Sequence, residues 1–388
     1  MWLSQLALVN FRNFRGLRLD AAPGLLLFRG QNGQGKSNLL ESIYVLATSR
    51  SPRTSVEREL LSWQAAEDAD LAAVVPPFAR LEGSVRREQR EVHLQLLFES
   101  QSLTNGLTRT IKVDGMPARA TGLVGQLPVV YFSPADVSLA GGPPAGRRQY
   151  LNLANSQASA DHLRALQRYN RVLLQRNQVL RQVRERRQPA SALEPWTEQM
   201  VSFGTQIIRQ RQTMLHDVAQ RAAPIFADLA GVTDTLDITY RSSVCTAAHD
   251  DLAKAFHAHQ AGVAAREIDQ AVSLVGPHRD DFGFLLGEVD LNTYGSRGQQ
   301  RLAVLALKLA EADWMHAQIG ELPVILLDDV LSELDPERRQ YVTDRIVRSD
   351  PSAERQVWIT STDLNGFTNE ILTGAQQFEI DAGRVRRA

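Results

Sequence analysis

The first third of the chain alternates between short apolar runs and polar breaks, as strands of a partly buried sheet do. Trp2, Leu3, Leu6 and Leu8 are in near alternation with other positions of Trp2–Val9, and two further short runs follow at Leu17–Asp20 and Leu25–Phe28. This pattern predicts three strands. The third run is followed by a glycine-rich loop, and Lys36–Ala47 then has the spacing of a helix that packs one face on a core.

Residues 55–125 continue the alternation. Val92–Leu96 and Arg109–Val113 each place apolar side chains at every second position, and Asp114–Gly115 is typical of a tight turn. We expect an antiparallel sheet here. Val129–Phe132 is apolar throughout, which favours a strand that is buried on both faces.

The segment Arg147–Leu229 has helical periodicity instead. It begins after a run of two glycines and two prolines, and Gln188–Pro189 interrupts it. The simplest interpretation is two packed helices. We expect their apolar stripes to form a core, and the stripes comprise Leu166, Tyr169, Leu173, Leu180 and Val183 on one helix and Trp196, Met200, Phe203, Ile207 and Met214 on the other.

After short predicted helices in 247–272, strands and helices alternate again from Asp281 onward, as in an α/β core. The predicted fold class is therefore α/β, with a nucleotide-binding core that an inserted domain splits in sequence. We expect residues 1–125 and 275–388 to form the split α/β head with its antiparallel β subdomain. Residues 126–274 would form the inserted, mainly helical domain.

Composition narrows the functional classes. The 388 residues carry a formal net charge of −1, so a nucleic-acid contact requires a local basic patch. Residues 144–187 are the candidate, because they hold 10 arginines against one aspartate and one glutamate, a balance of +8, and a solvated basic helix face explains this charge equally well. Cys245 is the only cysteine, which excludes an internal disulfide. No apolar run approaches the roughly 20 residues needed to cross a bilayer, and we expect a cytoplasmic protein without membrane contact.

The loop after the third strand has the pattern of glycine, four residues, then Gly-Lys-Ser. In this pattern the glycines let successive backbone N–H groups point at phosphate oxygens, and the helix N-terminus adds its positive dipole. We expect Lys36 to reach the β- and γ-phosphates of ATP and Ser37 to bind Mg²⁺. The loop consists of Gly30, Gln31, Asn32, Gly33, Gln34, Gly35, Lys36 and Ser37.

About 290 residues later, the apolar run Val324–Leu327 ends in Asp328 and Asp329. Two aspartates after a strand often only cap the next helix, but the phosphate loop favours a Walker B strand. Asp328 would then hold Mg²⁺, directly or through water. Asp329 stands where related ATPases usually carry a glutamate that orients the attacking water. Because aspartate is one methylene shorter, we expect slow hydrolysis.

Between these motifs, Tyr294–Arg301 precedes an expected helix over Leu302–His316 and resembles the signature loop of ABC-type ATPases. In isolation, a serine that caps a helix and is followed by glycine is the favoured explanation of this loop. The order of phosphate loop, signature and Walker B strand favours the functional interpretation. In ABC-type heads the signature serine and glycine contact a nucleotide bound to the other subunit, which here assigns Ser296 and Gly298. Gln299 is a candidate beside the water.

Two further segments bear on this assignment. Ser332–Asp335 resembles the D-loop, which lies along the dimer seam in ABC-type heads. The final apolar strand, Val357–Thr360, is followed by no histidine where many transporters of this class carry a switch histidine. Thr360 or Thr362 is the candidate γ-phosphate sensor instead.

The complete set resembles the RecF family, compact relatives of the Rad50 and SMC ATPases. The resemblance rests on Val9–Phe14, the phosphate loop running into Asn38–Glu41, Gly276–Asp281, Gly295–Arg301 and Leu327–Asp335. It implies an ATP-dependent homodimer that binds duplex DNA near single-strand gaps and acts with RecO and RecR to load RecA in recombinational repair. It also implies weak, DNA-stimulated hydrolysis of ATP.

The sequence departs from the family pattern in places. Ser37 replaces the more usual threonine and keeps its hydroxyl, and Arg50–Arg53 lacks a histidine that we expect before its second arginine. We interpret His278 as part of a structural turn. The long separation of phosphate loop and Walker B strand argues against a transporter subunit. A RecF-like ATPase of a phage-defence or nuclease-regulating system would share the same head chemistry, and gene neighbourhood would distinguish it.

Overall fold

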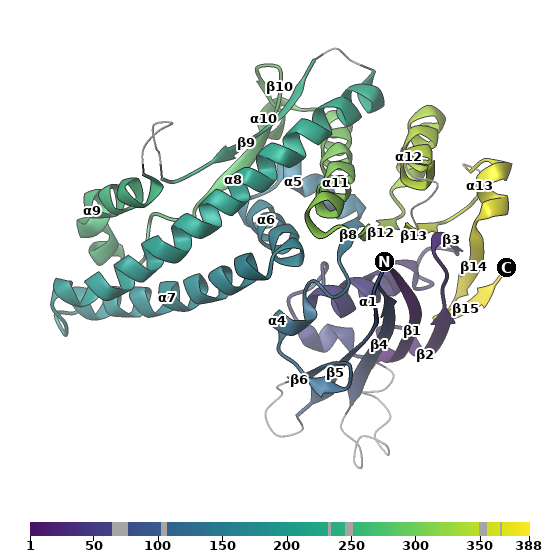
Figure 1. The fold of residues 1–388 in the computed structure, drawn as a ribbon, viewed down its shortest axis with the longest axis horizontal. Helices are drawn as coiled ribbons and strands as arrows, with labels where there is room; N and C mark the ends of the chain where they lie inside the picture. The colour runs from purple at the N-terminus through teal and green to yellow at the C-terminus, as the bar shows by residue number, and fades with distance from the viewer. Residues whose placement is uncertain (64–76, 102–106, 232–233, 245–250, 349–354, 365–366) are drawn as a thin grey trace. The chain divides into compact units, whose positions relative to one another are not determined.

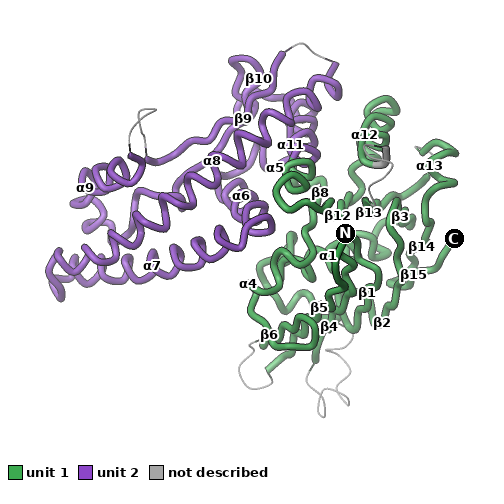
Figure 2. Tube along the Cα trace, in the orientation of Figure 1, with its two compact units in different colours: residues 1–136, 311–388 green, residues 137–310 purple. Residues whose placement is uncertain are grey.

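The computed structural model describes residues 1–63, 77–101, 107–231, 234–244, 251–348, 355–364 and 367–388 (Figure 1). The chain forms two compact units (Figure 2). Unit 1 comprises residues 1–136 and 311–388, and unit 2 comprises residues 137–310. These limits differ from the predicted bounds of the head and the inserted domain. The division into those two domains stays a prediction. Cys245 lies outside the described residues.

Unit 1 contains a six-stranded sheet in the order β15-β14-β3-β13-β12-β8. The five strands from β14 to β8 run parallel, and β15 pairs antiparallel with β14. The expected strands β3, β8, β12 and β13 are confirmed. The bounds are β3 Gly24–Arg29, β8 Val129–Phe132, β12 Val324–Asp328, β13 Gln356–Ser361, β14 Gln376–Asp381 and β15 Arg384–Arg387.

The apolar runs of this sheet are buried because both of its faces are covered. All four residues of β8 and all five of β12 are buried. Phe28 of β3 stacks on Trp358 and Phe378 from its two neighbouring strands, with ring centroids 5.1 and 4.9 Å apart. Continuous burial of this kind is typical of parallel strands.

The second sheet of unit 1 is antiparallel, as predicted, in the order β2-β1-β4-β5-β6-β7. Helix α1 (Lys36–Thr48) packs on it at Gly83, where a Cβ atom would lie 2.5 Å from Leu46 Cδ2. The predicted turn Asp114–Gly115 joins β6 and β7, and both residues have positive φ angles. The strand bounds are β1 Trp2–Phe11, β2 Phe14–Asp20, β4 Phe78–Arg86, β5 Glu91–Ser100, β6 Leu107–Val113 and β7 Met116–Pro117.

Unit 2 is mainly helical, with a small sheet in the order β11-β10-β9. The prediction of two helices over residues 147–229 was wrong, because Ser159 is extended and divides the first helical region. Its side chain caps the following helix by accepting from His162 N. The bounds are α5 Ser138–Gly141, α6 Pro144–Ala158, α7 Ala160–Arg184, α8 Glu194–Ala230, β9 Leu236–Arg241, α9 Leu252–Gln270, β10 Asp281–Leu286, β11 Val289–Asp290 and α10 Leu291–Tyr294.

Helix α11 (Arg297–Ile319) follows, and α12 (Pro336–Arg348) and α13 (Asn369–Gly374) belong to unit 1, as does the short α4 (Ala120–Leu123). The expected helix over 302–316 is confirmed within α11. Where short helices were predicted between 247 and 272, the described residues form the single helix α9. No helix in the described part of the chain is long and apolar enough to span a membrane.

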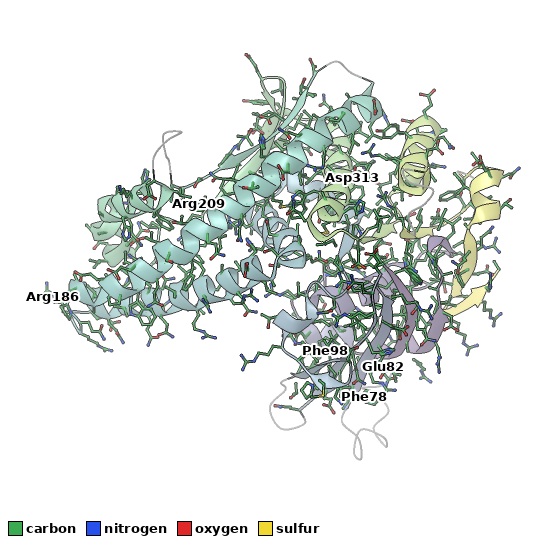
Figure 3. All side chains as sticks on the ribbon, in the orientation of Figure 1. Phe78, Glu82, Phe98, Arg186, Arg209 and Asp313 are labelled. Atoms are coloured by element: carbon green, nitrogen blue, oxygen red, sulfur yellow. The ribbon has the colours of Figure 1, made fainter. Side chains whose placement is uncertain are left out.

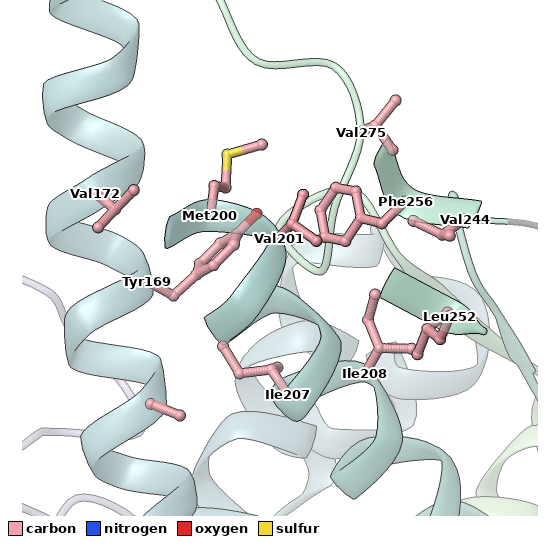
Figure 4. Close-up of a cluster of buried hydrophobic side chains, with 11 residues drawn as sticks. Tyr169, Val172, Met200, Val201, Ile207, Ile208, Val244, Leu252, Phe256 and Val275 are labelled. Carbon is pink, nitrogen blue, oxygen red and sulfur yellow. The ribbon is translucent and has the colours of Figure 1, made fainter. Parts of the chain in front are cut away.

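The core of unit 2 forms where α7, α8 and α9 meet (Figure 4). Tyr169 of α7, Met200 and Ile207 of α8 and Phe256 of α9 are buried in one cluster. At Gly204 a Cβ atom would lie 2.6 Å from the Phe256 ring, so glycine permits α8 and α9 to approach closely. The predicted apolar stripes of α7 and α8 are thus confirmed as core, except at Val183, which is half-buried and lies outside the cluster.

A buried ion pair also holds this unit together. Arg176 of α7 donates to Glu267 of α9 over 2.6 Å, and neither side chain is more than 3% exposed. The other Glu267 oxygen accepts from Leu274 N, and Arg176 also donates to Ser273 Oγ. Removing one member would leave a buried charge without its partner, which is more costly than losing a surface pair.

We therefore expect Glu267→Ala to lower the free energy of unfolding by about 3–5 kcal/mol, measured by denaturant titration. The control is Glu185→Ala, which removes an exposed partner of Arg187 and should cost less than about 1 kcal/mol. Equal losses in the two variants would contradict a structural role for the buried pair.

Candidate nucleotide-binding site

The strand register of the parallel sheet brings the predicted motifs of unit 1 to one edge. Asp328, at the end of β12, pairs with Thr360 of β13, and Thr360 pairs with Phe28 of β3. The phosphate loop begins directly after β3. Because the carboxyl ends of parallel strands share an edge, the loop and both aspartates lie together there, where α/β sheets commonly bind ligands.

The phosphate loop has the backbone conformation that its glycines permit. Gly33 and Gly35 have φ angles of +83° and +118°, in a region that other residues rarely adopt. Gly35 is the N-cap of α1, and the first turn of this helix has no acidic residue. The positive end of the helix dipole therefore meets no anion from its own first turn.

Lys36 folds back over the loop. Its ammonium group donates to the carbonyl oxygens of Gly30 and Gln31, and the residue is only 6% exposed. Burial lowers the pKa of Lys36, while the nearby Asp329 and Asp328 oppose that shift. The ammonium group is thus held against the backbone of the loop by these two carbonyl oxygens.

Asp328 is the centre of a hydroxyl cluster. Its Oδ1 accepts from Ser37 Oγ and from Thr360 Oγ1, each over 2.9 Å, and its Oδ2 accepts from Tyr131 OH over 3.1 Å. Burial and the neighbouring carboxylate raise the pKa of Tyr131, so this phenol remains a donor. The paired Ser37 hydroxyl and Asp328 carboxylate provide the oxygen ligands that Mg²⁺ prefers.

Asp329 adopts an unusual backbone conformation beside this cluster. Its φ angle is +54°, and its N–H donates to the backbone and side-chain oxygens of Thr360. Its Oδ1 is buried and accepts no hydrogen bond from the described residues. A strained residue with an uncommitted buried acceptor is typical of functional sites. The hydroxyl of Thr360, one of the two candidate γ-phosphate sensors, donates to Asp328 and accepts from Asp329 N.

The signature residues lie at the start of α11, in unit 2. Ser296 Oγ accepts from Gln299 N over 3.2 Å, and Gln299 Oε1 accepts from Ser296 N over 2.9 Å, which forms a reciprocal capping box. Both residues are exposed, as is Gly298. A Cβ atom on Gly298 would meet no described atom closer than 3.9 Å, so the helix N-terminus is open to a partner. Tyr294 beside it is 78% exposed.

The segment that resembles a D-loop follows directly after the aspartate pair. Ser332 Oγ donates to Asp329 O over 2.7 Å, and Arg339 donates to the carbonyl oxygens of Leu331 and Leu334. Ser332, Glu333 and Asp335 remain exposed. The backbone is therefore fixed while its polar side chains face solvent.

Sequence analysis missed a polar network behind the phosphate loop. Arg12 makes two hydrogen bonds to the buried Glu41, over 3.0 and 2.7 Å. Arg53 donates to Asn38 Oδ1 over 2.7 Å and reaches Glu41 at 3.4 Å. Arg53, which belongs to the segment Arg50–Arg53 that departs from the family pattern, is thus bound to α1. The only sequence signal was the family resemblance of Val9–Phe14 and Asn38–Glu41, which contain Arg12 and Glu41.

The Gly276–Asp281 motif is structural within unit 2. His278 Nε2 donates to Ser273 O over 3.0 Å, and the unprotonated Nδ1 accepts from Tyr169 OH over 2.6 Å. Arg147 pairs with Asp281. Burial lowers the pKa of His278 to about 4, so it is neutral near pH 7. The turn assigned to His278 from the sequence agrees with these contacts.

The basic segment separates into buried and exposed arginines. Arg147 and Arg176 are buried in ion pairs, whereas α7 and the residues just beyond it carry an exposed row. Arg186, labelled in Figure 3, lies just past the end of α7. We call this row the α7 arginine face, and it comprises Arg164, Arg168, Arg171, Arg181, Arg184, Arg186 and Arg187.

The fold and the motif geometry define an ABC-type P-loop ATPase head with an antiparallel β subdomain and a helical unit. The family described as RecF/RecN/SMC N terminal domain matches residues 2–377. The DNA replication and repair protein RecF of Herpetosiphon aurantiacus is 41% identical over 99% of both chains. That of Staphylococcus carnosus is 34% identical over 99% of this chain and 100% of its own. The chain belongs to the RecF family.

Solved structures agree with this assignment. A structure of the recombination mediator protein RecF-ATP in the RecFOR pathway has a TM-score of 0.86 and 28% identity, covering 100% of this chain and 97% of that one. An Smc head bound to the C-winged helix domain of ScpA has a TM-score of 0.55 at 13% identity, covering 100% and 98% of the two chains. The second comparison shows the fold alone.

Proposed function

We propose that this chain is an ATP-dependent DNA-binding protein of recombinational repair that acts in the cytoplasm and dimerises when it binds nucleotide. The observation that carries the proposal is the contact between Ser37 and Asp328, which places a phosphate loop beside a carboxylate suited to Mg²⁺. Relatives named DNA replication and repair protein RecF support the repair context, and a RecF structure with ATP supports the nucleotide.

In this proposal the amides of Gly30–Ser37 and the Lys36 ammonium group bind the phosphates of ATP. Ser37 and Asp328 hold Mg²⁺, which neutralises charge on the phosphate oxygens. Asp329, whose Oδ1 has no partner among the described residues, orients the attacking water. Gln299 is a second candidate near that water. Hydrolysis is slow and resets the complex.

The dimer follows from the exposed signature loop. Ser296 and Gly298 form an open helix N-terminus, which can approach a phosphate closely through its backbone N–H groups. We propose that they complete the site of a second copy of this chain. Because the nucleotide then contacts both protomers, its binding free energy contributes directly to dimer stability.

The α7 arginine face is the proposed contact for duplex DNA. Its exposed guanidinium groups can bind phosphates without base specificity, which suits a protein that recognises gapped and junction DNA by structure. RecO and RecR are the proposed partners in loading RecA. The name of the RecF-ATP structure, which places that protein in the RecFOR pathway, supports these partners.

The dimer is tested by sedimentation of the protein with and without Mg-ATP. We expect wild type to dimerise with nucleotide and Ser296→Arg to weaken the dimer by more than about 2 kcal/mol, because an arginine at the helix N-terminus occupies the phosphate position and opposes the dipole. Ser191→Arg adds the same charge at an exposed serine outside the motifs and should dimerise normally. A Ser296→Arg protein that dimerises like wild type would count against a dimer in which Ser296 contacts the nucleotide of the second copy.

Replacement of Asp329 tests the hydrolytic role. We expect Asp329→Asn to retain Mg-ATP affinity and to lose about 100-fold or more in the rate constant of hydrolysis, because the amide cannot accept a proton from water. Phosphate release under single-turnover conditions measures the step, and Asp20→Asn serves as an exposed control on β2. Hydrolysis by Asp329→Asn at the wild-type rate would refute the role.

The DNA contact predicts a specific salt dependence. Replacing Arg181, Arg184 and Arg187 together by alanine should reduce the slope of log affinity against log salt by about 2–3, since each phosphate contact contributes about 0.9. Fluorescence anisotropy of duplex DNA across a salt series measures it. A control triple variant at the exposed Arg86, Arg384 and Arg386 should keep the wild-type slope, and an unchanged slope for the α7 variant would exclude this face.

A further inference from the structure

Two turns outside the phosphate loop make hydrogen bonds to the middle of the loop. Gln34 O accepts from Asn13 Nδ2 over 2.9 Å and from Gly383 N over 3.0 Å. The Gln34 side chain also takes part, because its Oε1 accepts from Ala382 N over 2.7 Å. Asn13 lies between β1 and β2, and Ala382–Gly383 joins β14 to β15. The loop is therefore bound from both ends of the sequence.

These contacts leave no room for added atoms. A Cβ atom on Gly35 would lie 2.6 Å from Asn13 Nδ2, and one on Gly383 would lie 2.2 Å from Asn13 O. At Gly30 it would lie 2.4 Å from Ile380 O on β14. Real Cβ atoms do not approach backbone oxygens so closely, so Gly30 and Gly383 fit only as glycine. At Gly35 the neighbour is a side-chain amide, and the φ angle of +118° is what requires glycine.

The β14–β15 turn adopts a conformation that its sequence disfavours. Asp381 pairs with Arg384, which leaves Ala382 and Gly383 as a two-residue connection with φ angles of +45° and +74°. Asn-Gly is the usual sequence for such a turn, and alanine in the left-handed region is strained. Both N–H groups of this turn point at Gln34, so the strained conformation is the one that contacts the loop.

Asn13 also connects the loop to the start of α1. Its Oδ1 accepts from Asn38 Nδ2 over 2.8 Å, and Asn38 Oδ1 accepts from Arg53. One amide side chain thus bonds the middle of the phosphate loop and the first turn of the helix that follows. The relative position of these two segments determines where the loop N–H groups point.

We propose that Asn13 and the Ala382–Gly383 turn are positioning residues that hold the phosphate loop in its nucleotide-binding conformation before nucleotide arrives. This inference rests on the proposed function, since it concerns the same site. A loop that is ordered in advance loses less conformational entropy on binding, so affinity for phosphate groups depends on these contacts.

Gly383→Ala and Gly115→Ala form a matched pair. Both glycines are in two-residue turns with nearly equal φ angles, +74° and +77°, but a Cβ atom meets nothing within 4 Å at Gly115. Both variants carry the same backbone strain, and only Gly383→Ala forces the turn away from Asn13. We expect Gly383→Ala to weaken Mg-ATP binding by more than about 10-fold, and Gly115→Ala by less than about 2-fold.

Asn13→Ala removes the side-chain hydrogen bonds of Asn13 without adding atoms. It therefore tests the positioning role even if Gly383→Ala does not fold. Loss of its two hydrogen bonds should weaken binding of Mg-ATP and Mg-ADP by about 3- to 10-fold, measured by equilibrium titration. In the nucleotide-free protein, amide hydrogen exchange of residues 31–37 should become faster while the β12 and β13 amides keep their wild-type rates. A general loss of stability would accelerate all of these amides together.

The outcomes separate the two hypotheses. If wild type binds Mg-ATP and both Asn13→Ala and a folded Gly383→Ala bind it equally well, the positioning role is overturned while the proposed function stands. If wild type does not bind Mg-ATP, the proposed function fails. Hydrogen exchange in the nucleotide-free protein still tests the positioning role in that case. Exchange rates at residues 31–37 that do not change in Asn13→Ala would overturn it.

Discussion

The structure of unit 1 depends on satisfying one buried carboxylate. Asp328 is 6% exposed at the end of β12, and burying an ionised group is costly unless hydrogen bonds compensate it. Its three hydroxyl donors, Ser37, Thr360 and Tyr131, come from α1, β13 and β8. Each donor reaches Asp328 only in the observed strand register. The same contacts that satisfy the carboxylate therefore bring together segments that lie far apart in the sequence.

This constraint explains why the chain can carry a long intervening unit without disturbing the site. Ser37 and Asp328 are separated by 291 positions, yet both belong to unit 1. Residues 137–310 fold around their own core at Tyr169, Met200 and Phe256 and their own buried ion pair. Since each unit buries its own apolar and charged groups, changes in unit 2 need not alter the contacts of Asp328.

Local patterns predicted most of the strands and helices because burial repeats every two or 3.6 residues along them. They failed where a single polar contact decides the outcome. Ser159 ends one helix and caps the next without interrupting the apolar stripe. The β14–β15 hairpin escaped prediction because Ala382–Gly383 is not a strong turn sequence, and its conformation depends on Gln34, almost 350 positions away.

The candidate site shows the same division. Glycine spacing and paired aspartates predicted which residues gather at the sheet edge, because those residue types carry the chemistry. Nothing local indicated that Asn13 bonds the phosphate loop or that Thr360 is committed to the aspartate pair. Such contacts join strands that only the complete sheet brings together, so they become visible only in the structure.

Gln299 and Asp329, the two candidates for orienting the attacking water, differ in the hydrogen bonds that they already make. The Gln299 amide is engaged in the capping box of α11, where it satisfies a helix N–H that would otherwise lack a partner. That bond fixes the amide at the helix N-terminus, so only the second lone pair of Oε1 and the Nε2 donors could contact water. Asp329 already has a buried oxygen without a partner among the described residues, and its backbone is held by Thr360. Asp329 can therefore accept a hydrogen bond from water at Oδ1 without losing another bond, and Asp329 is the stronger candidate.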